Sequence, residues 1–189
     1  MLTRTVAPAV DPVSLVEAKA HMRVVSTMDD DSIRMYLGAA VDLLDGPTGL
    51  LGRAICTQTW AWVTPAFDSQ MRLPIGQASA IVSVQYLDTA GAAQTLSSAN
   101  YYLAHDALGP YLKNTPTGSW PSLIDRDDAV TITFTAGFGD AAAVPRNLKA
   151  GIMMLASHLY ENREIYSETK AVPQGFSAWD LIEPYRRVL

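Results

Sequence analysis

The chain has 189 residues, of which 49% are hydrophobic and 17% charged, and its formal net charge is −5. This length accommodates one domain, or one domain with an insertion, around a substantial core. The acidic balance and the lack of a basic run argue against tight binding to nucleic-acid phosphates, and no apolar run approaches the roughly 18 residues of a membrane span.

The N-terminal region predicts an extended arm followed by a short helix. Residues 1–12 are punctuated by prolines and are expected to lie outside the core. Ser14 and Glu17 have the spacing of a capping box, in which the two side chains satisfy each other's backbone amides. We therefore expect a helix that begins after Ser14 and runs to about Val24.

Three consecutive aspartates, Asp29, Asp30 and Asp31, precede a second helical pattern. Carboxylates at this position stabilise the positive end of the helix dipole, so we interpret the run as a helix start rather than as a metal site. The pattern ends at Gly46 and Pro47, because proline cannot continue a helix. The residues expected on its apolar face are Ile33, Leu37, Ala40, Val41 and Leu44.

The segment from Ala54 to Ala143 predicts short antiparallel strands. Ala54–Thr64 is rich in β-forming residues and contains the single cysteine, Cys56, which we interpret as a buried strand residue. Further strand candidates follow at hairpin spacing and are separated by turn residues. They are 70–73, 80–87, 93–96, 100–104, 110–113 and 129–136, and together they predict a meander, a sandwich or an open barrel.

The longest helical pattern runs from Val144 to Glu164. Its apolar residues cover one face and a neighbouring stripe, which is too wide for a helix with its back to water. Such a helix is either central to a bundle or covered on its second side by another chain. The residues expected to pack within the protomer or against another chain are Leu148, Ile152, Met153, Ala156, Leu159 and Tyr160.

The last residues form a very apolar, aromatic segment behind a polar stretch that ends at Gly175. Two interpretations are open: a last helix docked on its own core, or an arm that fills a groove on a neighbouring protein. The candidate docking residues are Phe176, Trp179, Ile182, Tyr185 and Arg186.

Two motifs have to be considered as possible cofactor-binding or catalytic sites. Residues 137–142 match the dinucleotide pattern G-x-G-x-x-A, but the next helix begins too late, at Pro145, for its amides to hold a phosphate at the glycines. We interpret this stretch as a strand-to-helix loop. His105 and Asp106 would form half of an acid–base pair in a loop. We assign no catalytic, cofactor-binding or metal-binding residue and expect no enzyme.

The order of helices, then strands, then a helix predicts an α+β fold. We expect a small helical bundle body with an inserted antiparallel β domain and an apolar C-terminal docking tail. The expected divisions are residues 1–53 for the arm and two helices of the body, 54–143 for the β insertion, 144–170 for the central helix and 171–189 for the docking segment.

Four stretches, in order over nearly the whole chain, carry a resemblance to a known family. They are Pro12–Arg23 with the aspartates after it, Gly52–Trp60, Ala136–Gly139 leading to Val144–Pro145, and His158–Glu164 with Pro184–Arg186. Together they resemble the head–tail connector (adaptor) proteins of tailed bacteriophages, in the subfamily with a β insertion. Residues 45–52 depart from the usual pattern, where a longer second helix is expected.

The resemblance implies a structural protein of the virion neck that assembles in the host cytoplasm. It implies a ring of about twelve copies under the portal protein, with a stopper or tail-completion protein docked below. DNA would pass through the ring without specific binding, and no membrane would be involved. Alternatives are another neck or tail-completion (stopper) protein, or an intracellular enzyme or ligand-binding domain with a site near His105 and Asp106.

Overall fold

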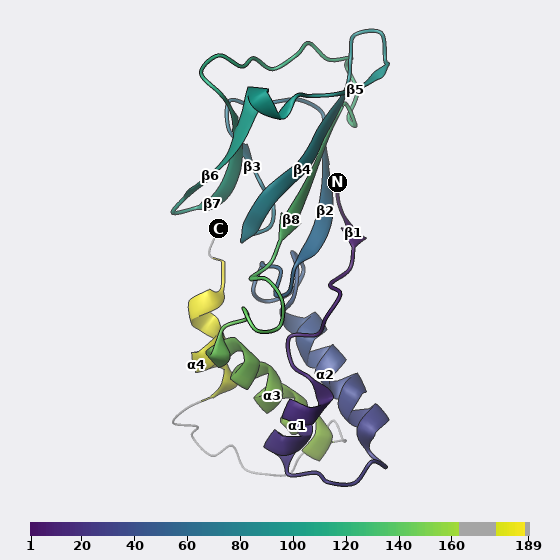
Figure 1. The fold of residues 1–189 in the computed structure, drawn as a ribbon, viewed down its shortest axis with the longest axis vertical. Helices are drawn as coiled ribbons and strands as arrows, with labels where there is room; N and C mark the ends of the chain where they lie inside the picture. Colours follow the sequence, from purple (N-terminus) through teal and green to yellow (C-terminus); the bar gives the residue numbers. More distant parts are fainter. Residues whose placement is uncertain (163–176, 188–189) are drawn as a thin grey trace. The chain divides into compact units, whose positions relative to one another are not determined.

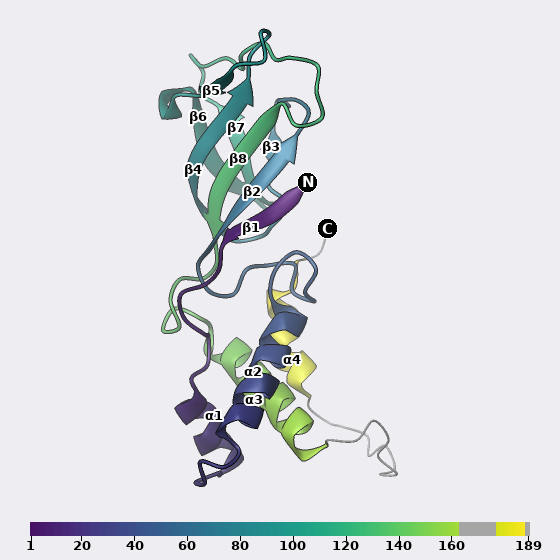
Figure 2. The same cartoon turned by 90° about the vertical axis from the view of Figure 1, so that its right-hand side faces the viewer.

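The structure is a computed structural model that describes residues 1–162 and 177–187. The chain divides into two compact units (Figures 1 and 2). The sheet unit comprises Met1–Ala9 and Thr57–Gly137, and the helical unit comprises Val10–Cys56 and the described part of Phe138–Arg187. The predicted α+β class with antiparallel sheets is confirmed.

The sheet unit contains two antiparallel sheets that face one another in both views (Figures 1 and 2). One sheet has the strand order β1-β2-β8-β4-β5 and the other the order β3-β7-β6. The strands are β1 (Leu2–Val6), β2 (Gln58–Thr64), β3 (Met71–Arg72), β4 (Ala78–Leu87), β5 (Ala93–Thr95), β6 (Tyr101–Asp106), β7 (Gly109–Asn114) and β8 (Val130–Ala136).

Strand β8 supplies much of the core of the sheet unit. It lies between β2 and β4, and Val130, Ile132, Phe134 and Ala136 are each 0% exposed, whereas the residues between them are half-buried. This alternation arises because successive side chains of a strand point to opposite faces of the sheet. The same period of two in the sequence located this strand, and each of the other predicted strands overlaps an observed one.

Two segments differ from the sequence prediction. Residues 1–12 are predicted to be an arm, but Leu2–Val6 forms β1, which pairs with β2 at the edge of the larger sheet. The strand predicted from Ala54 begins only at Gln58, because Ile55 and Cys56 enter the core of the helical unit instead. Burial of Cys56 in that core raises the pKa of its thiol to about 11.

The helical unit is built from four helices among the described residues. Ile33, Leu37, Ala40 and Leu44 of the second helix are buried, as their spacing predicts, and they pack in one apolar cluster with residues of the third. The helices are α1 (Leu15–Met22), α2 (Asp30–Leu44), α3 (Arg146–Glu161) and α4 (Ala178–Ile182), and a 3₁₀ turn (Glu183–Tyr185) follows the last.

The predicted capping box at the start of α1 is confirmed. The Glu17 amide donates a hydrogen bond to Ser14 Oγ (3.2 Å), and the Ser14 amide donates to Glu17 Oε2 (2.8 Å). Lys149 of α3 lies 3.3 Å from Glu17 Oε1, so the same carboxylate also ties α3 to α1. The Ser14 backbone bond, the Ser14 hydroxyl and Lys149 together lower the pKa of Glu17.

Glu17→Gln keeps an oxygen that can accept from the Ser14 amide but removes the charge at the N-terminus of α1 and the ion pair with Lys149. The loss of this charge is expected to destabilise the helical unit by about 1 kcal/mol at neutral pH. The folded state lowers the pKa of Glu17, so this stabilisation is present above the pKa of the unfolded chain and is lost as pH falls through the folded value. The difference in free energy of unfolding between wild type and Glu17→Gln should therefore begin to shrink below about pH 4 and vanish once the pH lies below the lowered pKa of the folded state.

Denaturant unfolding followed by the helical circular-dichroism signal over a pH series measures this difference. Glu161→Gln changes an exposed glutamate in the last turn of α3 and is the matched control; it should stay within about 0.5 kcal/mol of wild type. A Glu17→Gln effect that persists unchanged at acid pH would contradict the prediction.

Candidate functional site

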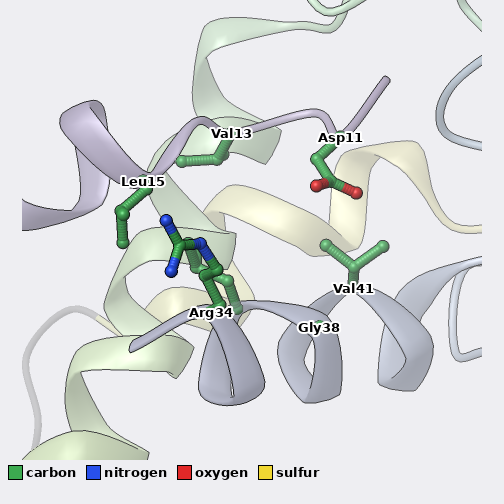
Figure 3. Close-up of a pocket in the computed structure, with 7 residues that line it drawn as sticks. Asp11, Val13, Leu15, Arg34, Gly38 and Val41 are labelled. Atoms are coloured by element: carbon green, nitrogen blue, oxygen red, sulfur yellow. The ribbon is translucent and has the colours of Figure 1, made fainter. Parts of the chain in front are cut away.

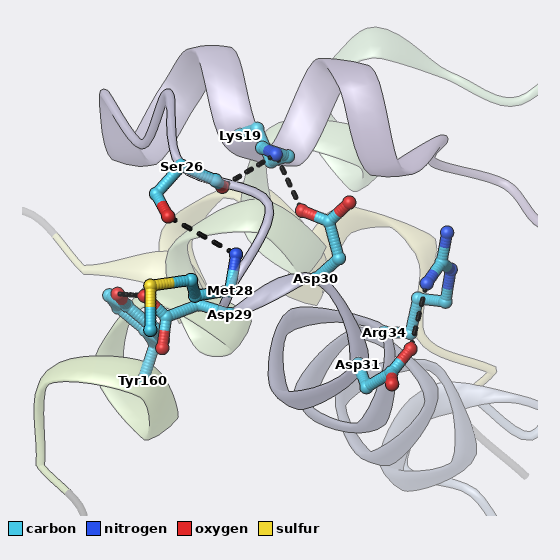
Figure 4. A network of polar contacts seen from close by, with 8 residues as sticks. All are labelled: Lys19, Ser26, Met28, Asp29, Asp30, Asp31, Arg34 and Tyr160. Atoms are coloured by element: carbon cyan, nitrogen blue, oxygen red, sulfur yellow. Dashed lines mark hydrogen bonds and ion pairs between the residues drawn. The ribbon is translucent and has the colours of Figure 1, made fainter.

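The loop between α1 and α2 is fixed by a polar network that joins three helices (Figure 4). Lys19 of α1 forms an ion pair with Asp30 at the start of α2 and donates a hydrogen bond to the Ser26 carbonyl (2.8 Å). The Tyr160 hydroxyl of α3 donates to Asp29 Oδ2 (3.1 Å). The aspartates therefore hold the start of α2 against α1 and α3.

The third aspartate has a different partner. Asp31 Oδ1 lies 2.9 Å from the Arg34 guanidinium, one turn further along α2 (Figure 4). Over residues 1–162 and 177–187, no group of three or more His, Cys, Asp or Glu side chains is arranged to hold a metal ion. In the same residues, no helix has the length and apolar character needed to span a membrane.

Two apolar side chains of this loop are almost completely exposed. Val25 and Met28 are each 93% exposed, whereas Val24 between α1 and these residues packs against the apolar core. Single exposed apolar side chains are common on protein surfaces, but here two of them lie three residues apart in one short loop. We regard Val25 and Met28 as one candidate contact surface, here called the loop tip.

A groove lies between the segment before α1 and the exposed side of α2 (Figure 3). Its volume is about 250 Å³. Its lining is mainly apolar, with the Asp11 carboxylate and the Arg34 guanidinium toward different ends (Figure 3). The lining residues are Asp11, Val13, Leu15, Arg34, Leu37, Gly38 and Val41.

The residues predicted for packing on α3 have three different environments. Leu148, Ile152 and Ala156 are each 0% exposed and belong to the apolar cluster of the helical unit. Met153 and Tyr160 are half-buried against that cluster. Leu159, at the same helical angle as Ile152, is 36% exposed because it lies in the last turn of α3, beyond Ala156.

Two of the predicted docking residues pack on the protomer itself. Ile182 is 1% exposed and lies against Gly151 of α3, so closely that a Cβ on that glycine would be 2.7 Å from Ile182 Cγ1. The Tyr185 ring meets the Phe138 ring edge-on, with centroids 6.1 Å apart. For these two side chains the structure shows the first of the two open interpretations, packing on their own core.

The other predicted docking residues are differently placed. Trp179 is 43% exposed, and Arg186 is exposed while its guanidinium lies 3.4 Å from Glu183. Phe176 lies outside the described residues. Trp179 and Arg186 are therefore the described members of this set whose side chains are available to a partner.

His105 and Asp106 lie at the end of strand β6 and have partners within the sheet unit. His105 Nε2 donates a hydrogen bond to the Ala78 carbonyl (2.9 Å), which joins the two sheets. Arg72 donates two hydrogen bonds to the Asp106 carboxylate (2.8 and 2.7 Å). The hydrogen bonds from Arg72 hold the pKa of Asp106 well below its usual range, so this carboxylate does not serve as a general acid.

The glycine motif connects a strand to a helix. Asp140 Oδ1 accepts hydrogen bonds from the amides of Ala142 (3.0 Å) and Ala143 (3.1 Å). The next helix, α3, begins only at Arg146. The amides of the loop are therefore turned to Asp140, and the helix N-terminus lies away from the glycines, unlike in a dinucleotide site.

Sequence reasoning missed the loop tip and the groove. The signal for the loop tip was present, since Val25 and Met28 are apolar residues in the short loop between two helices. The groove had no local signal. Its lining comes from the chain before α1 and from α2, which are more than a dozen residues apart and meet only in the folded unit.

No protein-family model matches the sequence, and no curated protein matches it. Solved structures of gene transfer agent (GTA) particles, which are phage-like, do match. The chain is 25% identical to a chain of the neck of an empty GTA particle computed with C6 symmetry; the match has a TM-score of 0.80 and covers 100% of this chain and 96% of that chain.

Two further solved structures show the same fold. A chain of the virion of a native GTA particle is 24% identical, with a TM-score of 0.78. A chain of the native GTA neck computed with C12 symmetry is 23% identical, with a TM-score of 0.73. Each match covers 100% of this chain and 96% of the other. The whole fold, with both units, therefore occurs in structural assemblies of a phage-like particle.

Proposed function

We propose that this chain is a head–tail connector (adaptor) subunit of a phage-like virion. It forms a ring in the neck, below the portal protein and above a stopper or tail-completion protein, and DNA passes through the ring. The observation that carries the proposal is the full-length match to a chain of the GTA neck, at 25% identity and a TM-score of 0.80. The role is structural rather than enzymatic.

The symmetry of the matched necks supports a homo-oligomeric ring. These structures were computed with C6 and C12 symmetry, and a ring of about twelve copies agrees with both symmetries. The helical unit exposes several large apolar side chains in addition to the loop tip, including Val16 (77%) and Met35 (61%). Such side chains give another subunit apolar area to cover.

The proposed ring body contains α3, with Leu148, Ile152, Ala156 and the half-buried Met153 and Tyr160 as its protomer core. We assign portal docking to Trp179 and Arg186, because these side chains are exposed and because tryptophan and arginine are enriched among residues that carry binding energy.

Co-sedimentation of the full chain with the portal ring of the same genome, with the mass of the complex determined, tests the proposal. We expect a stoichiometric complex of ring size. Trp179→Ala with Arg186→Ala should weaken binding at least about tenfold, whereas Val82→Ala, an exposed residue of the sheet unit, should not. Truncation before α4 is a poorer test, because it also removes Ile182 from the core.

No binding to the portal ring or to DNA-filled heads would refute the connector role. Binding to a tail-side protein alone would instead indicate a stopper or tail-completion subunit. Unchanged portal binding by the double variant would leave the connector role intact and refute the assignment of Trp179 and Arg186.

A further inference from the structure

Hydrogen bonds hold the backbone on both sides of the loop tip. Helix α1 ends with Arg23 in the left-handed conformation (φ 57°), and the Val24 amide returns to the Lys19 carbonyl (3.0 Å). The Met28 amide donates to Ser26 Oγ (3.1 Å). Lys19 also ties the Ser26 carbonyl and Asp30 together (Figure 4). With the chain held on both sides of the loop tip, burying its two side chains in a partner costs little backbone entropy.

The groove on α2 has the size and lining to receive such side chains. Its volume of about 250 Å³ exceeds the roughly 150 Å³ of a protein cavity that holds benzene. Val13, Leu15 and Val41 supply apolar surface (Figure 3). A Cβ added to Gly38 would meet nothing within 4 Å, so the groove is open on the side of this glycine.

The loop tip and the groove are each flanked by one positive and one negative side chain. Arg23 precedes the tip and Asp31 follows it, and both side chains are exposed. The groove has the Asp11 carboxylate and the Arg34 guanidinium toward different ends (Figure 3). Asp31 and Arg34 already form an ion pair within one chain. An inserted loop tip can therefore place Arg23 beside Asp11 of the receiving chain, and this opposite-charge pair favours the insertion.

A cyclic ring requires this kind of pair. Each protomer of a ring with more than two copies presents two different surfaces, one that fits the next copy and one that fits the previous copy. The loop tip and the groove are two different, complementary surfaces of one helical unit. We propose that Val25 and Met28 of one copy insert into the α2 groove of a second copy of this chain, head to tail. This inference rests on the proposed function, because it names the self-contact of the ring.

Site-directed cross-linking of the full chain tests the contact. Met28→Cys and Val41→Cys place one thiol on the loop tip and one in the groove, and the native Cys56 is buried with its pKa raised to about 11, so it reacts little. The double variant is treated with a short bismaleimide in two preparations, one free at about 1 mM protein and one bound to the portal ring. In both preparations it should form a ladder of multimers. A mixture of the two single variants should form only dimers that join one of each.

Two variants of α2 serve as block and control. Gly38→Leu projects a side chain into open groove space and raises helix propensity, so it fills the groove without endangering the fold. It should lower the yield of multimers at least about tenfold. Ala39→Leu changes the next residue, which is also exposed but does not line the groove, and it should leave the yield unchanged.

Several outcomes would overturn the inference. They are no cross-links in either preparation, dimers alone from the double variant, a ladder that Gly38→Leu does not reduce, or cross-links only to another neck protein. A ladder without portal binding would support the contact and refute the connector role. A stoichiometric portal complex without the ladder would support the connector role and refute the contact between the loop tip and the groove.

Discussion

Gly49→Ala is expected to destabilise the helical unit by about 3 kcal/mol or more. A Cβ at this position would lie 2.3 Å from the Asp45 carbonyl oxygen and 2.4 Å from that of Leu44. Both atoms are backbone at the end of α2, so no side-chain rotation relieves the overlap. The loop after α2 has to move as a whole.

That loop cannot move without losing hydrogen bonds that complete α2. The amides of Leu50 and Leu51 donate to the carbonyls of Leu43 (2.9 Å) and Leu44 (3.2 Å), which lack partners inside the helix. Leu51 is also 0% exposed. Any shift that accommodates a methyl group at Gly49 therefore exposes apolar surface and leaves helix carbonyls unpaired.

Gly38→Ala is the matched control, with an effect of opposite sign. Gly38 lies inside α2, where an added Cβ meets nothing within 4 Å. Alanine should therefore stabilise the helix by about 0.5–1 kcal/mol. Denaturant unfolding of both variants, followed by the helical circular-dichroism signal, gives the comparison. A Gly49→Ala variant as stable as wild type would contradict the geometry of this loop.

In the same loop, one feature could be predicted from the sequence and another could not. The end of α2 was predictable, because Gly46 and Pro47 stop any helix. The return of Leu50 and Leu51 to the last turn of α2 was not, since it depends on the close approach at Gly49, which has no periodic signature. The residues that depart from the connector pattern, 45–52, are those that build this compact turn.

Long-range pairing explains the other differences. Strand β8 was predictable because its alternation lies within seven consecutive residues. Strand β1 was not, because its partner β2 lies more than fifty residues away and a short strand followed by two prolines resembles an arm. Ile55 and Cys56 continue the β-rich composition of β2, but composition does not reveal which of two cores a side chain enters.

Among the candidate surface residues, too, some environments could be predicted from the sequence and others could not. The buried positions of α3 could be predicted from helical spacing. The exposure of Leu159 could not, because it depends on where the elements packed around α3 end. The sequence showed that the last segment is apolar but not which partner covers each side chain. The packing of Ile182 on Gly151 and of Tyr185 on Phe138 separates the core residues of this segment from the exposed ones.

Ile182→Ala and Trp179→Ala are expected to have opposite profiles, although both residues belong to α4. Ile182 is 1% exposed, so truncation leaves a cavity against Gly151 and should lower the free energy of unfolding by about 2–5 kcal/mol. Trp179 is 43% exposed, so its truncation should cost about 1 kcal/mol or less in stability.

Portal co-sedimentation and denaturant unfolding of the two variants separate core packing from docking. We expect Trp179→Ala to lose portal affinity while it keeps its stability, because an exposed tryptophan has apolar area to bury in a partner. At a temperature where it stays folded, Ile182→Ala should retain most of its affinity, because its side chain is already buried in the protomer. If Ile182→Ala instead lost affinity at unchanged stability, α4 would have to leave the core to dock. The docking segment would then be a moving element rather than a fixed surface.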